Sequence, residues 1–186
     1  GDSAHAEGIS TIASGRASHA EGQRSEASGD FAHASGFETT ASGDFSYTEG
    51  YMTEASGLAS HAEGGHTVAT ADASHAEGSY VTASGTAAHA EGGYTRATSH
   101  YAHAEGFKTT ASAVASHAEG YSTHATRNAG AGHAEGTFTI ADDTAAHAEG
   151  TYTLAFGLAS HAEGSGSKAT GEFAHAEGNE TIASGG

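Results

Sequence analysis

Histidine and glutamate recur together along this chain in the tetrapeptide His-Ala-Glu-Gly. The first copy begins at His5, and further copies follow at a spacing of 14 residues. An imidazole and a carboxylate two residues apart are suited to general acid–base catalysis, to binding a metal such as zinc, or to forming ion pairs. Because a catalyst needs one distinctive constellation in a cleft, many equivalent copies argue against an enzyme. We therefore expect no catalytic residue and no cofactor.

The His and Glu positions form two columns, which we call the ladder. The chain carries 12 ladder His and 12 ladder Glu, and two copies are degenerate, with Ser35 in place of a Glu and Tyr47 in place of a His. The ladder comprises His5, Glu7, His19, Glu21, His33, Tyr47, Glu49, His61, Glu63, His75, Glu77, His89, Glu91, His103, Glu105, His117, Glu119, His133, Glu135, His147, Glu149, His161, Glu163, His175 and Glu177.

The elements that position the ladder follow from the rest of the repeat. A second half, seen clearly as Thr11-Ile12-Ala13-Ser14-Gly15, separates the tetrapeptides, and 13 units fit the chain. Glycine recurs too often for helices, because each interior Gly costs a helix about 1 kcal/mol. The pattern predicts a β-solenoid in which two strands of about five residues, joined by two-residue turns, close each coil. Two extra residues predict a lengthened turn at 128–132 that keeps the coil phase.

Alternation along a strand assigns the faces of each coil. Ala6 and Gly8 point inward while His5 and Glu7 point outward. In the second strand the recurring Thr and Ala point inward. The outward position of that strand, starting at Ile12, shows no chemical consensus along the chain. A freely varying position is typical of a solvated face, whereas the ladder face is nearly invariant.

Composition excludes several classes of protein. The chain has 42 Ala and 28 Gly but only 11 Ile, Leu, Val and Met, so a conventional globular core is nearly ruled out. The net charge of -17 disfavours nucleic acid and anionic membranes as partners. Without cysteine there is no disulfide or thiolate site. We expect neither a signal peptide nor a membrane span, and we interpret residues 1–186 as one repeat domain from a longer fibrous protein.

At Ala6, Gly8, Thr11, Ala13 and Gly15, and at their copies, the repeat resembles a known family. These positions match the Ala, Gly, Ser/Thr, Ala and Gly places of the YadA-like head repeat of trimeric autotransporter adhesins. Similar His-Ala-Glu-Gly repeats also resemble those of phage tail-fibre and appendage proteins. The resemblance covers essentially the whole chain and implies an all-β, left-handed parallel β-roll of 13 coils that assembles as a homotrimer.

The chain departs from the family pattern at two places. His5 and Glu7, with their copies, stand where the family has Val and Ile, which face the trimer interface. The resemblance thus places the ladder between three chains as a hydrogen-bonded, partly hydrated polar core. It also implies an extracellular structural role, at a cell surface or on a virion appendage, in adhesion to a host protein or glycan.

Two other interpretations of the ladder stay open: a solvent-facing stripe on a monomer, and, as the main functional alternative, a metal-binding β-solenoid. We predict that pairing raises the pKa of ladder His and lowers that of ladder Glu, so that stability is greatest at mildly acidic pH. We also predict that His33, which lacks its own Glu, reaches Glu49. Outside the ladder, His66, His100 and His124 are expected to be solvated.

Aromatic side chains gather at the turns, where a carbohydrate- or receptor-binding stripe competes with packing between turns or chains. They are Phe37, Tyr51, Tyr80, Tyr94, Phe107, Tyr121, Phe138 and Tyr152 after the first strand, and Phe31, Phe45, Tyr101 and Phe173 before the His position.

Overall fold

The structure, a computed structural model, describes residues 1–126 and 130–185. The chain is an all-β parallel β-solenoid of about thirteen coils, and no described residue lies in a helix. The fold class expected from the repeat is therefore confirmed. Consistent with this, the described part of the chain contains no helix that could cross a membrane. Internal contacts divide the chain into two units, Gly1–Gly93 and Tyr94–Gly186, which are described separately.

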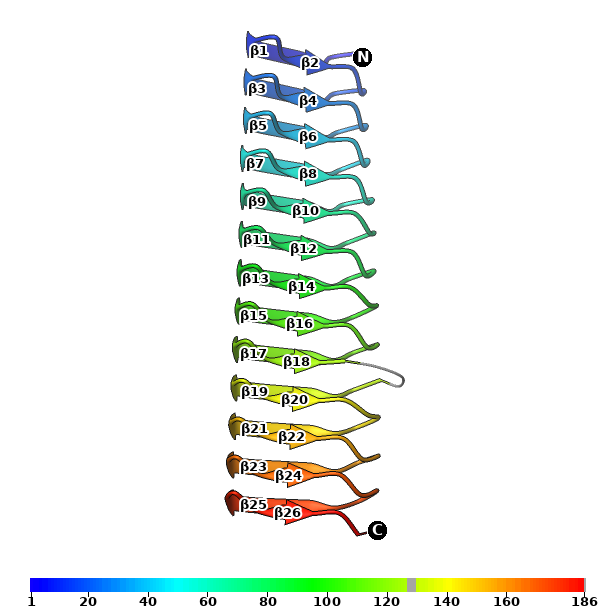
Figure 1. The fold of residues 1–186 in the computed structure, drawn as a ribbon. Coiled ribbons are helices and arrows are strands. Elements are labelled where there is room, and N and C mark those ends of the chain that lie inside the picture. The colour runs from blue at the N-terminus through cyan, green and yellow to red at the C-terminus, as the bar shows by residue number, and fades with distance from the viewer. Residues whose placement is uncertain (127–129, 186) are drawn as a thin grey trace. The chain divides into compact units, whose positions relative to one another are not determined.

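In the first unit each complete coil contributes a five-residue strand and a two-residue strand (Figure 1). The five-residue strands are β1 (His5–Ile9), β3 (His19–Gln23), β5 (His33–Phe37), β7 (Tyr47–Tyr51), β9 (His61–Gly65), β11 (His75–Ser79) and β13 (His89–Gly93). The two-residue strands are β2 (Ile12–Ala13), β4 (Glu26–Ala27), β6 (Thr40–Ala41), β8 (Glu54–Ala55), β10 (Val68–Ala69) and β12 (Thr82–Ala83).

The second unit repeats the same alternation. Its five-residue strands are β15 (His103–Phe107), β17 (His117–Tyr121), β19 (His133–Thr137), β21 (His147–Thr151), β23 (His161–Ser165) and β25 (His175–Asn179). Its two-residue strands are β14 (Arg96–Ala97), β16 (Thr110–Ala111), β18 (His124–Ala125), β20 (Ile140–Ala141), β22 (Leu154–Ala155), β24 (Lys168–Ala169) and β26 (Ile182–Ala183).

Within each unit the five-residue strands form one parallel sheet and the two-residue strands another. Paired residues are 14 positions apart, as in His75 opposite His89, so like residues of successive coils lie side by side. The pairing of β17 with β19 joins His117 to His133, which shows that the coil phase survives the two extra residues. The lengthened turn predicted at 128–132 falls partly on 127–129, outside the described residues.

The prediction of two similar strands per coil is wrong for the second strand. It spans only Ile12–Ala13 in the first coil, and a five-residue connection, 14–18, leads to the next ladder strand. That connection is a closed turn: the Ser18 hydroxyl donates to the Gly15 carbonyl at 2.8 Å, and the Ser18 amide donates to the same oxygen at 3.4 Å. Serine before the His position therefore stabilises the turn instead of extending the strand.

The core consists of small side chains, as the alternation predicts. Ala20 and Ala27, from the two kinds of strand, are fully buried, and their copies in the inner coils are equally inaccessible. The inward Thr column, represented by Thr39 and Thr109, is also fully buried. Because large side chains would not fit between the two short strands, methyl groups and backbone ladders are the main source of cohesion.

The buried Thr column gives a first prediction. Thr109 Oγ1 is one of several Thr hydroxyls that lack a hydrogen-bond partner among the described residues, and Val81 occupies the equivalent place in another coil. A buried hydroxyl without a partner costs about 1–3 kcal/mol. We therefore expect Thr109→Val to raise the free energy of unfolding by about 1 kcal/mol, measured by denaturant titration.

The neighbouring Thr110 is the matched control, because its side chain is only half-buried, on the outward position of β16. Thr110→Val should change stability little. Equal or lower stability of Thr109→Val relative to the parent would contradict the prediction.

Candidate functional site

The ladder occupies the first and third positions of the five-residue strands, where alternation turns its side chains away from the core. In β11, Ala76 is fully buried, whereas the side chains of His75 and Glu77 on either side are 33% and 46% exposed. The outward orientation inferred from the sequence is therefore confirmed. In a single chain the ladder is neither buried nor fully solvated.

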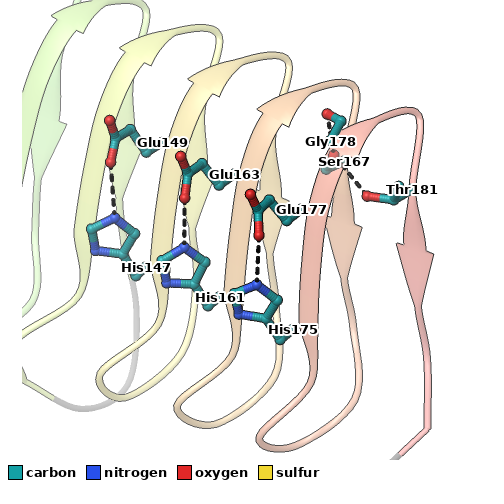
Figure 2. Close-up of polar contacts among 9 residues, drawn as sticks. All are labelled: His147, Glu149, His161, Glu163, Ser167, His175, Glu177, Gly178 and Thr181. Atoms are coloured by element: carbon teal, nitrogen blue, oxygen red, sulfur yellow. Dashed lines mark hydrogen bonds and ion pairs between the residues drawn. The ribbon is translucent and has the colours of Figure 1, made fainter.

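Each ladder His that has a Glu two residues on is directed at it. The His and Glu of each pair lie two positions apart on the same strand, and Figure 2 shows three such pairs, in β21, β23 and β25. The Nε2–Oε2 distances there are 3.5 Å for His147–Glu149, 3.4 Å for His161–Glu163 and 3.6 Å for His175–Glu177. These distances are long for hydrogen bonds, so each pair by itself is a weak contact.

The imidazole rings also stack from coil to coil. In the first unit, ring centroids are 4.7 Å apart between His61 and His75 and 4.8 Å apart between His75 and His89. In the second unit the stack from His117 to His133 has a spacing of 4.8 Å with planes 5° apart. His75, for example, therefore has an imidazole ring on each side. Protonation of two stacked imidazoles would place two positive charges next to each other, separated by the distance between successive coils.

At His75 and His33 the prediction of raised histidine pKa values is wrong. The pKa of His75 is lowered, first because burial disfavours its charged form and then because His61 and His89 repel its proton; Glu77 acts in the opposite direction but is weaker. The pKa of His33 is lowered too, again mainly by burial, with His19 adding to it. At His75 the loss of water and the two flanking imidazoles outweigh the single carboxylate of Glu77.

For the carboxylates the predicted direction holds at Glu21. Its pKa is lowered, chiefly because the Ser35 hydroxyl donates to Oε1 at 2.9 Å, with smaller contributions from His19 and His33. Ser35 lies one coil further along, in the degenerate repeat. The residue that replaces a ladder Glu thus stabilises the charged Glu of the preceding coil.

The second degenerate position corrects the predicted His33–Glu49 contact. Glu49 Oε2 instead accepts a hydrogen bond from the Tyr47 hydroxyl at 2.7 Å, and within the described residues His33 makes no hydrogen bond to Glu49. His33 stacks between His19 and Tyr47, at 4.9 Å from each. The bond to Glu49 is the main reason that the pKa of Tyr47 is raised to about 12. Tyr47 therefore keeps both the stack and the carboxylate contact, with a donor that is neutral at physiological pH.

The ladder provides no preformed metal site in one chain. Across the described ranges, no group of three or more His, Cys, Asp and Glu side chains is arranged to hold a metal ion. His75, for example, faces the single carboxylate of Glu77, and its flanking neighbours are the stacked rings of His61 and His89. A closed zinc site needs about four ligands, more than the described side chains of a single chain bring together at the ladder.

Outside the ladder, the three histidines expected to be solvated differ in exposure: His100 is exposed, whereas His66 and His124 are half-buried. His66 stacks on Tyr80 at 4.6 Å. His124 lines an open groove that sequence reasoning missed. The available signal was the column of aromatic residues beside it, but a column of residues does not reveal a hollow.

Comparisons with known proteins do not assign the chain to a family. No protein-family model matches it, and no curated protein matches it significantly.

Proposed function

We propose that this chain is a structural segment, a shaft or head, of a homotrimeric fibre on a cell surface or virion appendage. In this proposal the ladder faces of three chains meet as a hydrogen-bonded, partly hydrated polar core. The fibre holds an adhesive tip at a distance and supports attachment to a host protein or glycan. Its role is structural rather than enzymatic, and the segment itself contacts neither nucleic acid nor membrane.

The observation that carries the proposal is the contrast between the two outward columns. The ladder keeps His and Glu through nearly every coil, whereas the outward position of the two-residue strands changes freely, as in Glu54, Val68 and Thr82. Exposed ion pairs are worth only about 0–1 kcal/mol, so stability of a lone chain does not explain such uniformity. Contact with another copy does, because every coil would then meet the same partner surface.

The polar atoms of the ladder are suited to such contact. The pairs use Nε2 and Oε2, and in the described structure no hydrogen bond involves Nδ1 of His147 or His161. The side chains of the inner coils also retain a third to a half of their exposure, for example 34% for His161 and 47% for Glu163. Burial of polar groups is tolerated when partners satisfy them. A second chain or trapped water would supply those partners.

The resemblance to YadA-like head repeats supports the same arrangement. In that family the ladder positions face the trimer axis, which is where the proposal puts His and Glu. The left-handed roll, the trimer and the extracellular location all come from this resemblance, and the parallel solenoid with partners 14 residues apart is compatible with them.

Light scattering tests the proposal directly. Three chains of 18.3 kDa should give a mass of about 55 kDa at pH 8, whereas a mass near that of one chain at low protein concentration would contradict the trimer. The variant Glu163→Lys should dissociate the assembly, because it would place three cations together at one level of the core. Glu172→Lys has the same charge change at an exposed turn and should leave the mass unchanged.

A further inference from the structure

The second unit carries a continuous row of exposed aromatic rings outside the ladder. We call it the aromatic ridge, and it comprises Tyr94, Phe107, Tyr121, Phe138 and Tyr152. Successive ring centroids are 5.7, 5.5, 5.4 and 4.9 Å apart. The five residues lie at the ends of ladder strands or in the turns that follow, so each coil adds one ring.

The ridge is not part of the core. The exposed fraction of its residues ranges from 38% at Phe107 to 59% at Tyr152. The planes of Phe138 and Tyr152 are 10° apart, whereas those of Tyr121 and Phe138 are 79° apart. The near-perpendicular contact means that the row offers ring faces as well as edges. Contiguous exposed apolar surfaces of this kind mark binding sites on soluble proteins.

An open groove adjoins the ridge. It has a volume of about 330 Å³ and is lined by Ser122, His124, Phe138 and Ile140. The volume is within the range of small-ligand sites. Phe138 belongs to both features, so a ligand in the groove would touch the ridge. The hydroxyl of Ser122 and the imidazole of His124 supply polar groups beside two apolar side chains.

The chemistry of these residues points to a neutral sugar. Pyranose rings have apolar C–H faces that pack on aromatic rings and hydroxyls that bond to groups such as Ser and His. An anionic ligand is disfavoured, because the chain carries a net charge of -17 and, among the described residues, the ridge has a single cation contact, Lys108 over Phe107 at 5.3 Å. A purely apolar partner would leave the groove's polar groups unsatisfied.

The distance between successive aromatic rings along the ridge favours a sugar polymer over a single sugar as the ligand. A β-linked glucan advances along its axis by about the length of one sugar ring per residue, which is close to the spacing of the aromatic rings. Consecutive sugars could then contact consecutive coils. We propose that the ridge and groove form a binding site for a neutral, β-linked polysaccharide chain lying along the coils of the second unit. This site goes beyond the shaft function and does not depend on the trimer.

Calorimetric titration with cellohexaose and chitohexaose tests the proposal. We expect at least one of them to bind, and Tyr121→Ala and Phe138→Ala each to weaken that binding by about tenfold, as expected for the loss of one stacked ring in a shared site. Tyr101→Ala is the matched control. Tyr101 is 66% exposed and lies at the other turn of a coil, outside the ridge, so its removal should leave affinity unchanged.

Three results would overturn the site: no binding of either hexasaccharide, equal affinity in all three variants and the parent, or tighter binding of an anionic oligogalacturonate than of the neutral sugars. Circular dichroism checks that each variant is folded. Light scattering on the same samples separates this proposal from the trimer, because a parent protein that binds neither hexasaccharide while keeping an intact mass of 3 × 18.3 kDa would overturn the ridge alone.

Discussion

Replacing Gly64 by alanine is expected to destabilise the fold severely, whereas the same change at Gly65, the next residue, is expected to have almost no effect. Gly64 has φ of +113°, a region that L-residues avoid, and a methyl group there would lie 2.1 Å from the carbonyl oxygen of Gly78 in the following coil. At Gly65 a methyl group would meet no atom within 4 Å.

The size of the effect follows from two costs. Forcing alanine into this region costs about 1–3 kcal/mol, and overpacking against a hydrogen-bonded strand adds about 1–3 kcal/mol. For a chain of this length the melting temperature of Gly64→Ala should fall by about 10 °C, measured by circular dichroism. The prediction fails if the two variants melt together. Their difference measures the positive φ and the close approach of coils together, since sequence context and residue type are otherwise matched.

Acidification from pH 8 to pH 5 is expected to destabilise the protein. A His whose pKa is lower in the folded state holds fewer protons there than in the unfolded chain, so stability is present above the unfolded pKa of about 6.5 and is lost as pH falls. The lowered pKa of His33 and His75 gives this sign. The lowered pKa of Glu21 extends the loss below pH 4.5. The expectation of a mildly acidic optimum is thereby replaced by one at neutral pH or above.

Thermal melts across this pH range provide the measurement, and the natural replacement of a ladder His by Tyr47 indicates which variant to test. Tyr47 already replaces a ladder His and keeps both contacts. His75→Tyr should therefore flatten the pH dependence, because it removes a proton-binding ring from the stack while retaining an aromatic one. A melting temperature that rises on acidification, or one that stays constant in the parent protein, would contradict the stacking explanation.

Much of the fold could be predicted from the sequence, because every coil repeats the same alternation of residue types. The alternation His-Ala-Glu-Gly placed Ala20 inside and His19 outside, and both assignments are confirmed. The short second strand could not be predicted, because a backbone hydrogen bond closes the turn that follows it, from Ser18 to Gly15 in one coil and from Ala32 to Gly29 in the next. Residue spacing alone does not predict whether these residues form the hydrogen bonds of a turn or those of a longer strand.

The electrostatics of the ladder were harder to predict for a physical reason. Spacing places each His near a Glu, but the sign of its pKa change depends on burial and on the distance to the next ring, which is 4.7 Å from His61 to His75. At that separation a second proton is disfavoured. Likewise, the loss of a His at Tyr47 looks like a defect in the sequence, whereas its hydroxyl reaches Glu49 in the structure.

The central claim, that the ladder face lies between chains, is tested most directly by labelling histidines with diethylpyrocarbonate at pH 7.5 and locating the label by mass spectrometry. His100, which is exposed and outside the ladder, serves as an internal standard of full reactivity. If three ladder faces meet, inner ladder residues such as His147 and His161 should be protected while His100 reacts. Labelling of those residues in proportion to their exposure of about a third in a single chain would show that the ladder faces solvent and would contradict the trimeric core.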